Sequence, residues 1–188
     1  MVYCLADGVT LASYPYIVDT FFARETKGIV QKNLALGDIL SQTHKRGQPI
    51  QTIVVVNENK MAAHFKFIYR NKYPTAVDHI AKNRRAGINW AVVTERCPSI
   101  LITTSGTMKN KLFADVARLV FYDLPAKEVG GFRNLQTRVK NANQGKEVYF
   151  LFDSYLEKDA DMAPSIIKMM EDSHSEVPDF LLRYRNIR

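Results

Sequence analysis

The residues of this chain that could do chemistry are mainly cations in the polar stretches that follow apolar runs. Lysine and arginine occupy these stretches at Lys60, Lys82, Arg84, Arg85, Lys109, Lys111, Arg133, Arg138 and Lys140. Cations in loops either form a solvated rim or follow the phosphates of a polyanion, where each contact adds salt-dependent affinity. The sequence has 26 basic and 19 acidic residues, and its formal net charge of +7 suits a polyanionic partner. Charge alone leaves both interpretations open.

The patterns that would predict catalysis or metal binding are absent from the sequence. Neither G-x-x-x-x-G-K-S/T nor G-x-G-x-x-G occurs, and Gly130-Gly131 alone is typical of a flexible turn. Ser105 is not part of a G-x-S-x-G elbow. Cys4 and Cys97 are too few for a disulfide scaffold or a four-cysteine zinc site, and the four histidines do not pair at i, i+4. We therefore predict no catalytic residue, no metal ligand and no tight binding of a nucleoside triphosphate by this chain alone.

Apolar runs predict the strands of a sheet that would position the cations. The runs are Tyr16–Phe22, Ile53–Val56, Ser99–Thr104, Arg118–Tyr122 and Val148–Phe152. Unbroken β-branched runs such as Ile53–Val56 are typical of strands that are covered on both faces in a parallel sheet. Because ligands of such sheets bind at the carboxyl ends of the strands, we expect the site in the loops after Val56, Thr104 and Tyr122.

Amphipathic stretches between these runs predict helices. Apolar residues near helical spacing mark a helix over Ile29–Leu40. Met61, Phe65 and Ile68 follow at i, i+4 and i+7, so they are expected to form the core-facing side of a second helix.

A last helix is predicted around Ile166–Met170. Pro164 is expected in its first turn, where proline is tolerated, and Asp159 and Asp161 are expected to cap it from outside. Helices that alternate with strands at this spacing predict an α/β domain with a mostly parallel central sheet and helices on both faces.

Several runs, taken in order, resemble the motifs of one protein family. Ile100–Thr104 and then Leu119–Pro125, which ends in Tyr-Asp-Leu-Pro, are similar to two strand ends of the second RecA-like domain of DEAD-box RNA helicases. Ile53–Asn57 stands where that family has its fourth motif, and His79 lies near its His-Gly strand end. Glu176–Leu181 resembles the closing Val-Pro-x-Phe-Leu of the Vasa-like branch. The resemblance implies a RecA-like three-layer fold with a mostly parallel sheet flanked by helices.

The extent of the resemblance sets the expected domain boundaries. It covers residues 16–182 as a helicase C-terminal-type domain, with a linker or N-terminal extension at 1–15 and a basic tail with three arginines at 183–188. The apolar start at 9–22 is interrupted by polar residues and a proline, so neither a signal peptide nor a membrane span is predicted.

The nucleotide-facing motifs depart from the family pattern. The aspartate that closes motif V, which in the family contacts the ribose, is replaced by Leu112. The motif VI arginines fall on Thr137 and Lys140, with Arg138 one position out of register. Arginine fingers are worth about 10³–10⁵ in the rate of phosphoryl transfer, and threonine carries no charge while lysine lacks the planar fork. The resemblance therefore implies a degenerate, non-catalytic domain that needs no cofactor, with ATP and Mg²⁺ bound only where an active first domain is present.

The RNA-facing positions keep more of their character. Thr104 matches the motif V threonine that meets an RNA phosphate, Lys109 keeps the charge of the motif V arginine, and Lys60 matches a basic residue after motif IV. Arg84 and Lys111 add cations nearby, although the family's Q-x-x-R pattern is not matched cleanly. Contacts to phosphate need only charge and donors, so the resemblance implies RNA binding that is single-stranded and sequence-tolerant.

The predicted function is RNA-associated assembly within a longer protein, by RNA backbone binding, protein interaction or both. Domains of this degenerate kind occur beside Tudor domains in germline small-RNA (piRNA) factors, a placement that the resemblance permits, along with cytoplasmic ribonucleoprotein granules. A self-association or partner-binding scaffold without RNA binding, as a homodimer or with another protein, remains open. So does the C-terminal half of an active ATP-dependent RNA helicase.

Overall fold

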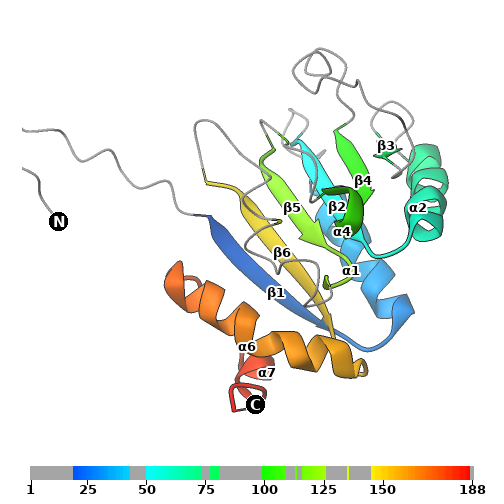
Figure 1. The fold of residues 1–188 in the computed structure, drawn as a ribbon. Helices are drawn as coiled ribbons and strands as arrows, with labels where there is room; N and C mark the ends of the chain where they lie inside the picture. Colours follow the sequence, from blue (N-terminus) through cyan, green and yellow to red (C-terminus); the bar gives the residue numbers. More distant parts are fainter. Residues whose placement is uncertain are drawn as a thin grey trace, which may run out of the picture.

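The computed structural model describes residues 19–42, 50–72, 77–80, 99–108, 113, 116–125, 135 and 145–186. They form a sheet with strand order β1-β6-β5-β2-β4-β3, and every neighbouring pair of strands is parallel. Helices α6 and α7 lie on one side of the sheet, and α1 and α2 lie on the other (Figure 1). The predicted α/β architecture with a parallel central sheet is confirmed.

The strands coincide closely with the apolar runs. They are β1 (Thr20–Thr26), β2 (Thr52–Val56), β3 (Val77–Ile80), β4 (Ile100–Thr104), β5 (Arg118–Phe121) and β6 (Glu147–Asp153). Every residue of β2, β4 and β5 is buried, because helices cover both faces of the sheet. The first predicted strand is displaced: β1 starts at Thr20 and runs on to Thr26, while positions 16–18 lie outside the described residues. No apolar run marked β3.

The two helices on one face differ in how well their buried sides were predicted. Helix α1 (Ile29–Ser41) is where the spacing placed it. Helix α2 (Asn59–Lys72) is confirmed, but its buried residues are Ala62, Phe65 and Tyr69. Ile68 is 42% exposed, so the expectation that it faces the core is wrong. Tyr69 stands one turn after Phe65 and packs edge-on against its ring at 5.9 Å, so it takes the core position instead.

Helix α6 (Glu157–Asp172) begins earlier than predicted. Pro164 therefore lies inside the helix and not in its first turn. Asp159 and Asp161 also lie within the helix, and the residue before it, Leu156, makes no side-chain cap, so the capping prediction is wrong. Asp159 instead reaches back, and its Oδ2 accepts a hydrogen bond of 2.8 Å from the backbone N–H of Asp153.

Two short helices complete the described elements. Helix α4 (Ser105–Met108) follows β4 directly, and α7 (Asp179–Leu182) follows α6 on the same face of the sheet. In the part of the chain that the structure describes, no helix is both long and apolar enough to cross a membrane.

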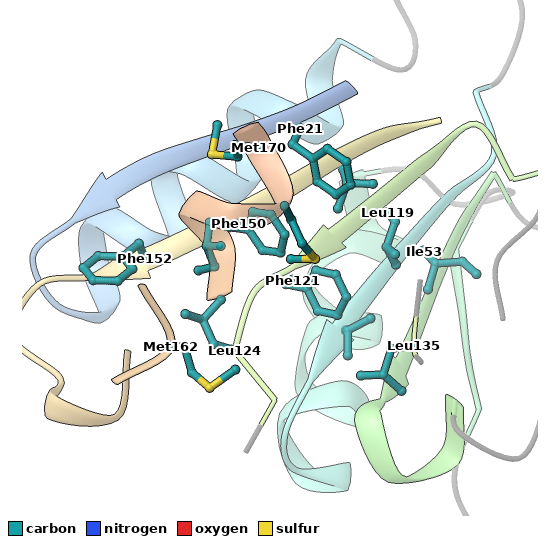
Figure 2. Close-up of a cluster of buried hydrophobic side chains, with 14 of the residues drawn as sticks. Phe21, Ile53, Leu119, Phe121, Leu124, Leu135, Phe150, Phe152, Met162 and Met170 are labelled. Carbon is teal, nitrogen blue, oxygen red and sulfur yellow. The ribbon is translucent and has the colours of Figure 1, made fainter. Parts of the chain in front are cut away.

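The core consists of two layers, one on each face of the sheet. Figure 2 shows the layer under α6, where Phe21, Phe150 and Phe121 come from three neighbouring strands. Their rings stack, with centroid distances of 6.1 Å between Phe21 and Phe150 and 5.5 Å between Phe121 and Phe150. Met162 and Met170 of α6 belong to the same buried layer, with Met170 on the side of Phe21 and Met162 next to Leu124. Burial of such side chains contributes roughly 1.5–3 kcal/mol each, so this layer anchors α6.

An ion pair closes the amino edge of the sheet. The guanidinium of Arg118 donates to Glu147 Oε2 through Nε at 2.7 Å and Nη2 at 2.5 Å, and Nη1 donates to the carbonyl of Ile39 at 3.0 Å. Ile39 lies in the last turn of α1, where a cation is favoured by the helix dipole. Arg118 therefore ties β5 and β6 to the end of α1.

Candidate functional site

The carboxyl ends of the parallel strands meet at one edge of the sheet, which is where the sequence predicts the site. Val56 at the end of β2 is the register partner of Thr104 at the end of β4. The segments that follow these two residues, 57–60 and 105–108, therefore start side by side. On the other side of β2, Phe121 of β5 pairs with Val55, which brings the segment after β5 to the same edge.

Thr104 begins helix α4 as its cap. Its Oγ1 accepts a hydrogen bond from the backbone N–H of Thr107 at 3.2 Å and lies 3.0 Å from the Thr107 hydroxyl. Both residues are buried. Two hydroxyls carry two hydrogens, and their mutual bond uses one, so the pair keeps one O–H for a further acceptor. Thr104 thus has a structural role in this turn and lies at the predicted edge.

Lys60 lies in the first turn of α2, just after β2, and it is exposed. No ion pair within the described ranges involves its ammonium group. The structure therefore brings together two of the predicted RNA-binding residues, Lys60 and Thr104, at the ends of neighbouring strands.

The other predicted site residues lie outside the described residues. They are the RNA-binding candidates Arg84, Lys109 and Lys111 and the degenerate nucleotide-site positions Leu112, Thr137, Arg138 and Lys140. Their roles remain predictions from the sequence.

The segments after β2 and β5 are fixed to each other. The backbone N–H of Asn57 donates to Asp123 Oδ2 at 3.0 Å, and the Asn57 side-chain amide donates to the Leu124 carbonyl at 3.3 Å. The Tyr-Asp-Leu-Pro sequence that carried the family resemblance therefore has a mechanical role here. It holds the loop that leads to Lys60 in one position.

A buried lysine on α1 completes this edge and was missed by the sequence analysis. Lys32 is 3% exposed, and its Nζ lies 3.7 Å from Asp123 Oδ1 and 3.9 Å from Asp159 Oδ2. The same Nζ lies 5.3 Å from the centre of the Tyr122 ring. A signal was available: Lys32 precedes Leu36 and Ile39 at i+4 and i+7, which places it on the buried side of the helix.

The carboxylates around Lys32 outnumber the cation. Asp153 Oδ1 accepts hydrogen bonds from the backbone N–H groups of Gly28 and Tyr155, both at 3.1 Å, which stabilise its charge. Asp159 is fully buried, and its Oδ1 has no hydrogen-bond partner among the described residues. Burial raises the pKa of Asp159, against the opposing effects of the Asp153 N–H and of Lys32. We call Lys32, Asp123, Asp153 and Asp159 the buried charge cluster.

Tyr122 is a neutral member of the same edge. Its hydroxyl donates to Asn33 Oδ1 at 2.8 Å, and burial followed by the charge of Asp123 raises its pKa. A tyrosine with a raised pKa stays protonated and acts as a donor, not as a base. Within the described residues, no group of histidine, cysteine and acidic side chains is arranged to hold a metal ion. This part of the edge is therefore suited to holding loops in place, and the exposed ammonium group of Lys60 is suited to contacting an anion.

The comparisons with known proteins show likeness in structure alone. No protein-family model matches the chain, and neither does any curated protein. The yeast DEAD-box splicing factor Prp28 superposes with a TM-score of 0.71 at 15% identity, covering 96% of this chain and 39% of that chain. The C-terminal domain of the DEAD-box protein Dbp5 gives 0.62 at 17% identity, covering 83% of this chain and 86% of the domain. Dbp5 of S. cerevisiae bound to RNA and ADP BeF3 gives 0.61 at 15% identity, covering 90% of this chain and 46% of that chain.

The superpositions, at identities this low, establish the fold alone. The chain has the RecA-like α/β fold of DEAD-box helicase C-terminal domains, as the sequence resemblance predicted, and it spans about two fifths of the Prp28 chain.

Proposed function

We propose that this chain is a helicase-like domain that holds single-stranded RNA by its phosphate backbone at the carboxyl edge of the sheet and contributes no catalytic group to ATP hydrolysis. One observation carries the proposal: Lys60 and the Thr104–Thr107 hydroxyl pair lie at this edge, where the neighbouring strands β2 and β4 end, in a fold shared with Dbp5, which is bound to RNA in its structure. The net charge of +7 supports a polyanionic ligand.

The contacts that we propose are to phosphate. Lys60 supplies an exposed ammonium, and Arg84, Lys109 and Lys111 are proposed to add cations at the same edge. Phosphate contacts position a nucleic acid and carry no base code, so the binding should tolerate any RNA sequence. The loop carrying Lys60 is held in place by Asn57, so little ordering entropy opposes the contact.

The proposed lack of catalysis rests on the degenerate positions. Leu112 cannot hydrogen-bond a ribose, Thr137 and Lys140 cannot form the planar fork of an arginine finger, and Arg138 lies one position away. We propose no cofactor for this domain, with ATP and Mg²⁺ entering only through an active first domain elsewhere in a longer protein. RNA-stimulated ATPase activity of such a full-length protein would contradict this.

The cellular setting that we propose is RNA-associated assembly in cytoplasmic ribonucleoprotein granules, as in germline small-RNA (piRNA) factors that combine degenerate helicase and Tudor domains. Its support is the family resemblance together with the basic charge, and a protein partner or a second copy of the chain could act at surfaces other than the carboxyl edge.

The test is a titration of the chain with fluorescent single-stranded RNA at about 50 mM and about 200 mM salt, with light scattering on the same samples. Four phosphate contacts at a slope of about −0.7 each predict that affinity falls roughly 50-fold over this range. Lys60→Glu and the double variant Lys109→Glu/Lys111→Glu should weaken binding and flatten the slope. Lys168→Glu, an exposed lysine of α6 on the opposite face, is the matched control. Binding that is independent of salt, or that the control weakens equally, would overturn the proposal.

A further inference from the structure

Strand β1 forms an edge of the sheet, beyond β6, and its main-chain groups alternate in direction (Figure 1). The N–H of Thr20 and the carbonyl of Thr26 are bonded on the β6 side, both at 3.0 Å. The even-numbered residues of the strand therefore face β6. The main-chain groups of Phe21, Ala23 and Glu25 point the other way, out from the edge of the sheet.

Part of this outer side is unoccupied. The N–H of Phe21 donates to Ser175 Oγ at 3.0 Å. Among the described residues, none forms a hydrogen bond with the other outward main-chain groups, which are the Phe21 carbonyl and both groups of Ala23 and Glu25. Ala23 is partly exposed, so its main chain is within reach of a ligand. Two N–H groups and three carbonyls in a row are a template for another strand.

Charged side chains commonly protect an exposed sheet edge, but those of β1 are held by elements of their own chain. Glu25 accepts a hydrogen bond of 3.0 Å from Arg183, which follows α7, and Arg24 lies 4.0 Å from Asp38 of α1. The strand has seven residues, none of them proline, and its register with β6 is continuous. Beyond the bond from Ser175, the described residues give this edge little protection.

A pocket of about 630 Å³ lies along the same strand. Residues 19–24 line it on one side, and residues 173–176 and Pro178, between α6 and α7, line it on the other. Phe22 is 37% exposed in this pocket, and its ring stacks on that of Tyr149 at 4.8 Å. The volume falls in the range of roughly 300–1,000 Å³ that is usual for ligand pockets.

Hydrogen bonds fix the wall of the pocket that follows α6. The N–H of Ser175 donates to the carbonyl of Met170 at 2.8 Å, and the N–H of His174 donates to the carbonyl of Glu171 at 3.1 Å. His174 has a φ of 56°, and this left-handed residue closes the helix as a Schellman motif. The turn brings Ser175 against β1. Because the wall is already in place, a ligand has little ordering cost to overcome.

We infer that this pocket binds an extended segment of a partner protein, which joins the sheet as a strand antiparallel to β1. An extended main chain presents N–H and carbonyl groups at the spacing of the free edge. The partner residue opposite Ala23, which we call position 0, exchanges both hydrogen bonds with it. Position +2 donates to the carbonyl of Phe21, and position −2 accepts from the N–H of Glu25.

The face of β1 toward α1 determines the side chains at two positions of the segment. Positions +1 and −1 stand opposite Phe22 and Arg24, in pairs where opposed side chains are close. An aromatic or large aliphatic side chain at +1 would cover the exposed part of Phe22. A carboxylate at −1 would pair with Arg24, whose contact with Asp38 at 4.0 Å is longer than a hydrogen bond and leaves guanidinium donors available among the described residues. The expected sequence is an acidic residue two positions before an apolar one.

A second copy of the chain and RNA fit this pocket less well. Two β1 strands paired symmetrically about Ala23 would bring Glu25 of one copy to Phe21 of the other, where Ser175 is already bonded. RNA has no row of alternating N–H and carbonyl groups at the spacing of a strand. Strands β6 and β5 separate β1 from β2, so the pocket is away from Lys60, and the inference does not depend on RNA binding.

The experiment is a selection of peptides of about 10 residues, enough for one strand, from a displayed random library on the complete 188-residue chain. Calorimetric titration of the enriched peptides follows. Peptides with the acidic and apolar spacing should be enriched, and Phe22→Ser and Arg24→Gln should each lower their affinity about tenfold. Circular dichroism verifies that both variants fold. Tyr155→Ser, which removes an aromatic side chain that is 72% exposed elsewhere, and Lys168→Glu are controls that should leave affinity unchanged.

Pairing of the main chains is tested on the peptide, so that folding of the variants does not enter. N-methylation at position 0 removes the N–H that bonds the carbonyl of Ala23, and it should lower affinity about tenfold or more. N-methylation at position +1, whose N–H points away from β1, is the matched control and should have little effect. Equal effects of the two methylations would overturn the inference.

The remaining outcomes separate the possible ligands. Unchanged RNA affinity in Phe22→Ser supports a peptide site, and a clear loss there assigns the pocket to RNA and overturns the inference. Dimerisation that Phe22→Ser abolishes would assign the edge to a second copy of the chain and likewise overturn it. A selection that enriches no peptide, or only peptides that Phe22→Ser does not affect, also overturns it.

Discussion

At the scale of single residues, Lys32 shows how a buried cation can hold the carboxyl edge of the sheet together. Its ammonium group lies between Asp123, which is bonded to the loop after β2, and Asp159, which is bonded to the end of β6. When one member of a buried group of charges is removed, the remaining charges are left buried and unpaired. The stability lost in this way is usually larger than the net stability that the complete group contributed.

We therefore expect Lys32→Met to lower the free energy of unfolding by about 3 kcal/mol, because methionine fills the space and leaves the carboxylates without a counter-charge. Urea unfolding followed by circular dichroism measures this. Lys27→Met, at an exposed lysine close to the start of the same helix, is the control and should change stability by less than about 0.5 kcal/mol. An equal effect of both changes would show that the cluster is not a unit.

The raised pKa of Asp159 gives stability a pH dependence of defined sign. Its ordinary value is 3.8, and burial raises it in the folded protein, so the folded state binds the proton more tightly than the unfolded state does. The stabilisation is complete below pH 3.8 and is lost as the pH rises through the folded pKa. Asp159→Asn keeps an acceptor for the Asp153 N–H but cannot ionise. Relative to that variant, the wild-type chain should lose stability in urea titrations as the pH rises above 3.8, and a parallel pair of curves would contradict this.

At the scale of elements, helix α6 tolerates a defect because its packing is strong. Pro164 supplies no N–H to the carbonyl of Ala160 one turn before it, and proline in a helix interior costs about 3 kcal/mol. The helix persists because apolar residues on both sides of the proline, among them Met162, Ile166 and Met170, are buried against the phenylalanines of the sheet.

Pro164→Ala should consequently stabilise the chain. Alanine restores the missing N–H donor and so removes most of the penalty that proline imposes on the helix. It also makes the unfolded chain more flexible, which lowers stability by roughly 0.4–1 kcal/mol, so the free energy of unfolding should rise by about 2 kcal/mol. Differential scanning calorimetry reports the shift in melting temperature. Ser165→Ala, at the next and exposed position, changes no backbone donor and should shift the melting temperature much less. A lower melting temperature for Pro164→Ala would mean that the proline ring is needed for packing.

At the scale of the whole molecule, the strands of the sheet could be predicted from the sequence where burial requires apolar residues throughout. β2 and β4 are recognisable because strands covered on both faces must be apolar throughout. β3 was not recognisable as an apolar run because it contains Asp78 and His79 within four residues, and only the family resemblance at His79 pointed to a strand end there. The strand order, which places the first strand beside the last, depends on pairings that no local pattern records.

The sequence was enough to locate the carboxyl edge of the sheet, but not to predict the contacts that hold this edge together. The loops after Val56 and Thr104 were identified from the general rule for parallel sheets, and Lys60 and Thr104 lie there. The buried charge cluster was missed because a single lysine inside an amphipathic helix is ordinarily exposed. The spacing with Leu36 and Ile39 marks Lys32 as lying on the buried side of its helix, but its partners Asp123 and Asp159 come beside it only through contacts between residues far apart in the sequence.

The pairing of β1 with β6 also has a consequence in time. Thr26 at the end of β1 bonds to Phe152 across a separation of 126 residues. At synthesis rates of about 5–20 residues per second, β1 leaves the ribosome roughly 6–25 s before its partner strand has been made. During that interval Phe21 and Phe22 have no sheet to join. The nascent chain must therefore be kept from aggregating until translation passes Asp153, and ribosomes stalled before that point would present an unpaired, aromatic strand to chaperones.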